Sequence, residues 1–220
     1  MSELKVHTLI KFGKRSDLER LLNQGEVYLN TWKHFKDSES NEVQGDEYEG
    51  LVAINQVANG SQLQIQVEEK FVPIQGLYGQ IKFSAGTSQL ENYNLYCMFA
   101  VTDESYQYLV DPRLKKFGDT EPAALVMANA DEFLARLRQK LDIEGFPHDC
   151  ALVRYVDIES HEGDMGPFNK LTDYCYQSEL RIIVHAKRKG PLKLWLGDIS
   201  DISFLFSMDD LMSRLRLDTE

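Results

Sequence analysis

LYCMFAV, residues Leu95–Val101, is an uninterrupted run of apolar and aromatic residues near the middle of the chain. A continuous apolar run of this length predicts a buried strand. A buried strand needs strand neighbours, so the remaining predicted elements decide what kind of sheet surrounds residues 95–101.

Most of the other predicted elements are also strands, marked by β-branched and aromatic residues between turn residues. Asn59-Gly60 predicts a turn between the third and fourth of them. The stretch Pro73–Glu91 predicts a long loop with a short strand inside it, and His161–Asp173 predicts another loop. The strands are predicted at Lys5–Phe12, Glu26–Thr31, Leu51–Val57, Leu63–Glu69, Ala123–Ala128, Ala151–Val156, Leu180–Ala186, Leu192–Leu196 and Ile202–Phe206.

Three helices complete the pattern. Ser16, with Glu19 three residues later, predicts a helix N-cap, and Gly25 predicts the end of that helix. The apolar residues of 130–141 fall on one helical stripe, and Ser207 predicts the cap of a short final helix. Strands outnumber helices and do not alternate with them. We therefore expect an α+β fold, mostly antiparallel with a few short helices, in a single domain of residues 1–220.

Composition limits the classes of function. The 220 residues carry a net charge of −11, which argues against a surface that binds duplex DNA or anionic lipid as a whole. We find no apolar run of transmembrane length and no secretory signal, so no membrane partner is expected. Cys97, Cys150 and Cys175 show neither CxxC nor zinc spacing, which favours a reducing, cytoplasmic location. No P-loop, GxGxxG, GxSxG or HExxH motif is present.

One acidic stretch is a candidate site. Residues 37–50, DSESNEVQGDEYEG, contain six acids and no base. Asp46 and Glu49 are three residues apart, so one helical turn would place both carboxylates on one face. They could bind a divalent cation, orient a cationic base or cap backbone donors. A solvated loop that uses Asp and Gly for its turns is the structural alternative.

The second candidate is YCYQSELRIIV, residues 174–184. On an extended backbone Gln177, Glu179 and Arg181 share one face, whereas Leu180 and Ile182 share the other. The stripe of polar side chains begins at the start of a predicted strand. It is either the rim of an active site or the exposed face of an edge strand.

Several elements together resemble a group of uncharacterised bacterial and phage proteins. The resemblance covers most of the chain but brings little established function. The matching elements are Lys11-Phe12-Gly13, Tyr28-Leu29-Asn30-Thr31 with Phe35, Gly45–Gly50 (GDEYEG), Leu95–Val101 and Tyr176–Ile182 (YQSELRI).

The order of elements is also similar to that of the ADP-ribosyltransferase superfamily, which binds NAD in a cleft between two antiparallel sheets. Gln177-Ser178-Glu179 resembles the Q-x-E element of that superfamily, at the start of a late strand. The resemblance implies that Glu179 is catalytic and that Gln177 positions the acceptor. Lys11 stands where the superfamily has Arg or His, and its Ser-Thr-Ser element has no clear counterpart. The residues that would bind NAD are Lys11, Phe12, Tyr28, Asn30, Thr31 and Arg181.

The leading hypothesis is therefore an NAD-dependent ADP-ribosyltransferase or NAD glycohydrolase, as a toxin or phage-defence effector. A carboxylate near the ribose would stabilise the oxocarbenium-like transition state. The acceptor would be a protein or a nucleic acid, and a cognate inhibitor or a second copy of the chain are further partners to consider.

Two alternatives remain open. One is a metal-dependent nuclease or phosphohydrolase in which Asp46, Glu49 and Glu179 are the oxygen ligands of the ion. The other is a non-catalytic phage or bacterial inhibitor that binds a host protein through its acidic surface.

Overall fold

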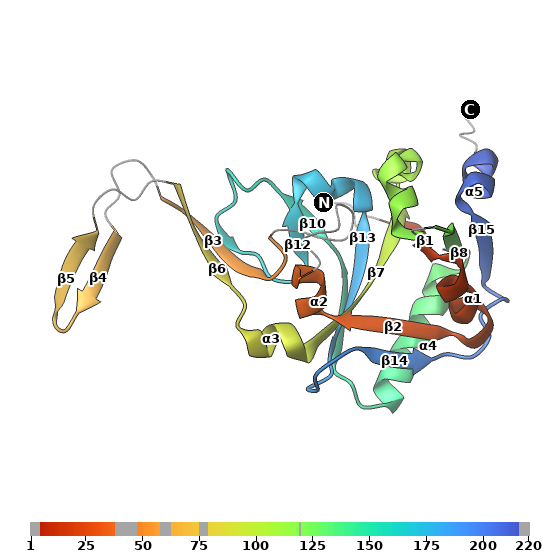
Figure 1. Cartoon of the computed structure of the whole chain (residues 1–220), viewed down its shortest axis with the longest axis horizontal. Coiled ribbons are helices and arrows are strands. Elements are labelled where there is room, and N and C mark those ends of the chain that lie inside the picture. The colour runs from red at the N-terminus through yellow and green to blue at the C-terminus, as the bar shows by residue number, and fades with distance from the viewer. Residues whose placement is uncertain (1–4, 38–47, 58–62, 75–78, 119, 216–220) are drawn as a thin grey trace.

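The computed structural model describes residues 5–37, 48–57, 63–74, 79–118 and 120–215. Its central strand is β7 (Tyr93–Thr102), which contains the apolar run that predicted a buried strand. Three strands pair with β7, all of them antiparallel, and together they form the middle of an eight-stranded sheet (Figure 1).

The two edges of β7 are paired differently. On one edge β13 (Glu179–His185) runs beside β7 from Phe99 to Tyr93 without a break. The other edge is shared by β1 (Val6–Lys14) and β2 (Glu26–Thr31). These two strands reach different parts of β7, so the sheet divides along this edge.

The remaining strands of the large sheet extend it outward. They are β8 (Pro122–Met127) beside β1, β15 (Ser203–Ser207) beside β8, β14 (Leu192–Trp195) beside β2, and β9 (His148–Leu152) beside β13. All of these pairs are antiparallel.

Smaller sheets and short helices surround the large sheet. One sheet joins β3 (Leu51–Val57), β6 (Gly79–Ser84) and β11 (Gly163–Asp164), and another pairs β10 (Arg154–Val156) with β12 (Asn169–Leu171) in parallel. The α-helices are α1 (Arg15–Gln24), α2 (Trp32–Asp37), α3 (Thr87–Asn92), α4 (Ala130–Ile143) and α5 (Met208–Arg214). The 3-10 helices are η1 (Tyr106–Val110), η2 (Pro112–Gly118) and η3 (Thr172–Gln177).

The main hydrophobic core lies between the large sheet and α4. Phe133, Leu137 and Leu141 of α4 are fully buried in it, together with Leu9 and Met127 of the sheet. The amphipathic stripe predicted for residues 130–141 is thus confirmed, and the helix continues to Ile143. In the part of the chain that the structure describes, no helix combines the length and the apolar character that a membrane crossing requires.

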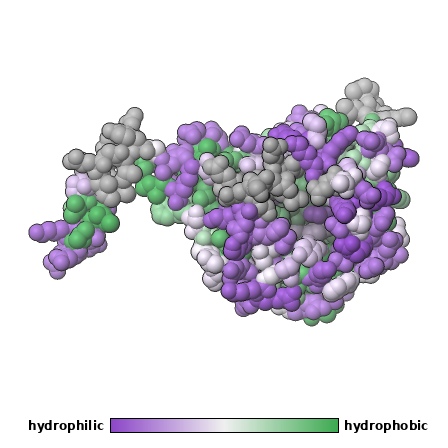
Figure 2. Space-filling model, in the orientation of Figure 1, coloured by the Kyte–Doolittle hydropathy of each residue, from purple (hydrophilic) through white to green (hydrophobic). Residues whose placement is uncertain are grey.

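A two-stranded arm, β4 (Leu63–Val67) and β5 (Lys70–Ile74), extends away from the rest of the molecule (Figure 1). Ile65, Val67 and Phe71 on this arm are more than half exposed. Figure 2 shows hydrophobic residues on the arm beside hydrophilic ones at its tip.

The expectation of an α+β fold with mostly antiparallel strands and few helices is confirmed. Residues Glu26–Thr31 and Leu51–Val57 form strands with the predicted bounds. Gly25 ends α1 in the left-handed conformation with φ of 64°, and Ser207 caps α5 by accepting a hydrogen bond from the Asp210 backbone.

Two local predictions are wrong. Helix α1 begins at Arg15, and Lys14 is its N-cap residue without a side-chain bond, so Ser16 is not a cap. The predicted hairpin between residues 51–57 and 63–69 does not form, because β3 pairs with β6 and β4 pairs with β5. Asn59 and Gly60 themselves lie outside the described residues.

The loops predicted at Pro73–Glu91 and His161–Asp173 contain more regular structure than expected. The first contains β6 and α3, and the second contains the short strands β11 and β12. The strand predicted at Ala151–Val156 is interrupted at Val153, because β9 pairs with β13 whereas β10 pairs with β12. These strands are only two to five residues long, so they carry no hydrophobic pattern of their own.

We predict that Leu137→Ala lowers the free energy of unfolding by about 2–5 kcal/mol, because it leaves a cavity in the main core. Ile143→Ala is the matched control on the same helix: Ile143 is 74% exposed, so this change should cost less than about 0.5 kcal/mol. Urea unfolding followed by circular dichroism measures both. Equal losses would show that α4 does not pack as described.

Candidate functional site

The candidate site lies where β1 and β2 separate along β7. Pairing with β1 ends at Phe99, and pairing with β2 begins at Leu95. In the described part of the chain, residues 96–98 therefore have no strand partner on this edge. Lys11 satisfies one of the backbone groups on this edge, because its ammonium donates a hydrogen bond of 2.6 Å to the Cys97 carbonyl oxygen.

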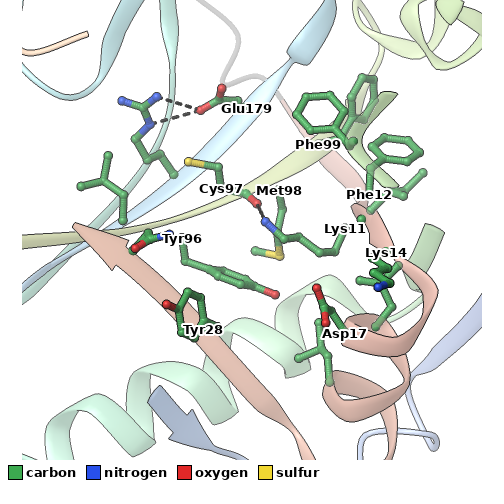
Figure 3. Close-up of a pocket in the computed structure, with 18 of the residues that line it drawn as sticks. Lys11, Phe12, Lys14, Asp17, Tyr28, Tyr96, Cys97, Met98, Phe99 and Glu179 are labelled. Atoms are coloured by element: carbon green, nitrogen blue, oxygen red, sulfur yellow. Dashed lines mark hydrogen bonds and ion pairs between the residues drawn. The ribbon is translucent and has the colours of Figure 1, made fainter. Parts of the chain in front are cut away.

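A cavity of about 510 Å³ opens at this separation. Side chains alternate between the faces of a strand, so Cys97 and Phe99 face one side of the sheet and Tyr96 and Met98 face the other. All four residues line the cavity, which lies at the gap between β1 and β2. In the view of Figure 3, Glu179 lies at the top, Tyr28 and Asp17 lie at the bottom, and Lys11 lies between them.

The lining of the cavity is basic although the protein is acidic. Six basic and three acidic residues line it, a formal excess of three positive charges in a chain with a net charge of −11. The basic residues are Lys11, Lys14, Arg20, Lys170, Arg181 and Lys193, and the acidic ones are Asp17, Glu26 and Glu179. Six aromatic residues also line it, namely Phe12, Tyr28, Phe35, Tyr96, Phe99 and Phe117.

Glu179 is held at the buried end of the cavity by two cations. Its Oε1 accepts a hydrogen bond of 2.7 Å from Lys170, and its Oε2 lies 3.0 Å from Nη2 of Arg181. Its backbone N–H donates to the Tyr155 hydroxyl at 2.9 Å. Glu179 is only 8% exposed, and these contacts fix both its carboxylate and its backbone.

Gln177 is brought to the same place by an unusual turn. It ends η3, and Ser178 then adopts the left-handed conformation with φ of 38°, which is uncommon for a residue other than glycine. The Ser178 hydroxyl donates to the Ala100 carbonyl oxygen at 2.8 Å and supports this turn. As a result the Gln177 side-chain oxygen accepts a hydrogen bond of 2.6 Å from Lys170.

Arg181 joins Glu179 to the end of the acidic stretch. Its guanidinium donates to Glu49 at 2.9 and 3.2 Å, and it also donates to the Pro167 carbonyl oxygen. Glu49 accepts a further hydrogen bond of 2.6 Å from the indole N–H of Trp32. Arg181 is 1% exposed, and its position between two carboxylates satisfies a charge that would be costly to bury alone.

These charges determine the protonation of Glu179. Burial by itself would raise the pKa of the Glu179 carboxyl, but Lys170 and Arg181 outweigh burial and hold this pKa at about 2. Burial also acts to lower the pKa of Lys170, yet Glu179 and Glu49 keep it above its ordinary value. The pair is therefore fully ionised at neutral pH.

Lys11 and Cys97 occupy the middle of the cavity. Burial lowers the pKa of Lys11, although the nearby Glu179 acts to raise it. The Lys11 ammonium also lies 4.7 Å from the ring centre of Tyr96, whose hydroxyl has no hydrogen-bond partner among the described residues. Burial and the charge of Glu179 raise the pKa of the Cys97 thiol to about 12, so Cys97 is not a thiolate nucleophile at neutral pH.

The structure brings together most of the residues that the sequence singled out. Thr31 does not line the cavity, because its hydroxyl accepts a hydrogen bond from the His34 backbone at the start of α2. Asp46 lies outside the described residues. Glu49 does not line the cavity and reaches it through Arg181 and Lys170, whose ammonium lies 4.0 Å from a Glu49 oxygen. The predicted residues that line the cavity are Lys11, Phe12, Tyr28, Asn30, Gln177, Glu179 and Arg181.

The edge-strand interpretation of residues 174–184 is wrong. Strand β13 pairs with β7 on one side and β9 on the other, so it is an interior strand. Its polar face is buried rather than exposed, because Arg181 and Glu179 neutralise each other there.

Sequence reasoning missed Lys170. It lies in the stretch predicted to be a loop, and a single lysine between an asparagine and a leucine carries no signal of its own. Only the pairing of β12 with β10 places Lys170 beside Glu179.

The contacts of Arg181 also affect the metal site that the nuclease hypothesis requires. Arg181 contacts both Glu49 and Glu179, which are two of the three carboxylates that the nuclease hypothesis requires. Within the described residues, no group of three or more His, Cys, Asp or Glu side chains is arranged to hold a metal ion.

No protein-family model matches the chain, and no curated protein or solved structure shows a significant match to it.

The lowered pKa of Glu179 predicts a specific loss of stability in acid. As the pH falls from about 5 to 2, the unfolded chain binds a proton at this carboxyl before the folded chain does, so folding becomes less favourable. Glu179→Gln removes this contribution, and its free energy of unfolding should fall less over the same pH range. Urea unfolding at several pH values measures the difference. The same pH dependence in both proteins would contradict the ion pairs described here.

Proposed function

We propose that the cavity binds NAD and that the protein cleaves the bond between nicotinamide and ribose, as an ADP-ribosyltransferase or an NAD glycohydrolase. The observation that carries the proposal is a basic cavity with aromatic walls, closed at its buried end by an ionised carboxylate, in an otherwise acidic protein. A dinucleotide has the matching parts: an anionic diphosphate, two heterocyclic rings and a ribose at the reacting bond.

Each part of the cavity has a role in this proposal. Lys11 and the other basic residues that line the cavity attract the diphosphate, because its charge is opposite to theirs. Phe12 and Tyr28 offer apolar surface to the rings. Phe12 is itself fixed by an edge-to-face contact with Phe99, with ring centres 5.8 Å apart.

The reaction follows from the position of Glu179. When the bond to nicotinamide breaks, its electron pair moves to the pyridine nitrogen and positive charge develops on the ribose. Water or an acceptor group then bonds to the same ribose carbon and releases a proton to solvent. A fixed carboxylate stabilises the positive charge, and a preorganised group of this kind is typically worth about 3–4 kcal/mol of barrier.

The division of the sheet supports the proposal at the level of the fold. In this proposal, the strands on the two sides of the gap between β1 and β2 are the counterparts of the two antiparallel sheets that the resemblance to ADP-ribosyltransferases implies, although here they form one sheet. The proposal includes a cytoplasmic location, with which the free state of Cys97, Cys150 and Cys175 agrees.

A second candidate function is the non-catalytic inhibitor that binds a host protein. The exposed Ile65, Val67 and Phe71 of the β4–β5 arm favour it, because exposed apolar side chains are typical of interaction sites. This hypothesis does not explain the basic cavity, so we place it second.

We predict that the purified protein releases nicotinamide from NAD and that Glu179→Gln lowers the rate by about 10²–10³-fold. Glu49→Gln is the comparison variant, because it removes a buried carboxylate from the same guanidinium but outside the cavity wall, so it should lower the rate less. Nicotinamide release by chromatography measures the rates, and thermal unfolding verifies that each variant is folded. Absence of NAD binding by calorimetry at millimolar NAD would refute the proposal.

A further inference from the structure

We propose that Lys170 is a positioning residue: its single ammonium holds Gln177 and Glu179 in the relative arrangement that acts on the ligand. This inference rests on the proposed function. The distances from the Lys170 nitrogen to the Gln177 and Glu179 side-chain oxygens are 2.6 and 2.7 Å, so all three groups are in hydrogen-bond contact.

The chemistry of an ammonium suits this role. It carries three N–H donors and no acceptor, so it can bind two oxygen atoms at once. Gln177 and Glu179 are separated by Ser178 alone, in a left-handed turn. Both side-chain oxygens are acceptors, so without a shared donor no hydrogen bond would hold them close to each other. Lys170 supplies that donor from a different strand.

Arg181 cannot take over this role, because it binds the other oxygen of the carboxylate. Its Nε donates to Glu179 Oε2 at 3.1 Å, whereas Lys170 holds Oε1. Two cations on two different oxygens fix the plane of the carboxylate. Removal of Lys170 would leave Glu179 free to rotate about its contact with Arg181, and would release Gln177 from this contact.

The backbone of Glu179 is held by the strand next to that of Lys170. Tyr155 of β10 and Lys170 of β12 are paired neighbours in the parallel two-stranded sheet. The Tyr155 hydroxyl accepts from the Glu179 backbone N–H, and Lys170 binds the Glu179 side chain. The sheet of β10 and β12 therefore binds Glu179 at both its backbone and its side chain. Lys170 is 4% exposed, so water does not compete for its contacts.

The test compares Lys170→Met, which removes the donors, with Lys170→Arg, which keeps a cation. We expect Lys170→Met to lower kcat for nicotinamide release by about 10–100-fold with little change in KM, by analogy with groups that orient metal ligands. Lys170→Arg should recover part of the rate. A loss of rate no larger than the loss of folded protein would overturn the proposal.

A second measurement does not depend on activity. The groups that face Glu179 are Lys170, Arg181, Lys11, Cys97 and Tyr155. In Lys170→Met the carboxylate keeps Arg181 and the Cys97 thiol but loses the ammonium, so the Glu179 carboxyl should titrate at a higher pH, and the acid limb of the pH–rate profile should move the same way. The ¹³C shift of this carboxyl, assigned by its absence in Glu179→Gln, reports the titration. An unchanged titration would overturn the proposal.

The outcomes separate this inference from the proposed function. If the wild-type protein neither binds nor cleaves NAD, the proposed function fails, and the carboxyl titration alone judges whether Lys170 holds Glu179. If the wild type is active and Lys170→Met is equally active, the positioning role fails. Should Lys170→Met not fold, Lys170→Gln replaces it, because it keeps an N–H donor near both oxygens but lacks the charge.

Discussion

The structure depends on a cluster of four buried charges, formed by Glu49, Arg181, Glu179 and Lys170. Each is expensive to bury alone, and the cluster offsets that cost because acid and base alternate along it. Removing one member would leave its partner uncompensated, which typically costs about 3–5 kcal/mol. That is a large fraction of the roughly 5–15 kcal/mol by which a protein is stable. The cluster therefore joins Glu49 to Lys170, Glu179 and Arg181, which are far from it in the sequence.

The same cluster gives the cavity its chemistry. A carboxylate next to a basic, aromatic cavity would take up a proton if burial alone acted on it. Lys170 and Arg181 prevent this and also prevent rotation, so Glu179 presents a fixed negative charge. The cations cancel much of that charge at a distance, and its effect is confined to groups in direct contact. In the proposed function, the Glu179 charge would therefore act on the one ribose in direct contact with it and little on the rest of the ligand.

The sequence predicted elements well where a hydrophobic pattern was long, whereas its caps were mixed: Ser207 caps α5, but Ser16 does not cap α1. The helix at residues 130–141 was correct because its apolar stripe has few alternative interpretations. Residues 95–101 were correctly predicted to form a buried strand for the same reason. The prediction of a hairpin around Asn59-Gly60 was wrong. Turn residues indicate that the chain can reverse its direction, but they do not indicate which strands then pair. Lys170 could not be found because its role depends on a pairing of two short strands.

By itself, the sequence determined the α+β class, the main strands and the shared face of Glu179 and Arg181 on one strand. These follow from local periodicity and residue type, which are properties of neighbours along the chain. Only the tertiary structure decided that this face is buried against Lys170 and Glu49, and that the turn at Ser178 brings Gln177 to the same place from η3. It also decided that β1 and β2 separate along β7 to open a basic cavity. Burial and charge pairing between distant segments arise from packing, and no local pattern encodes which segments will meet.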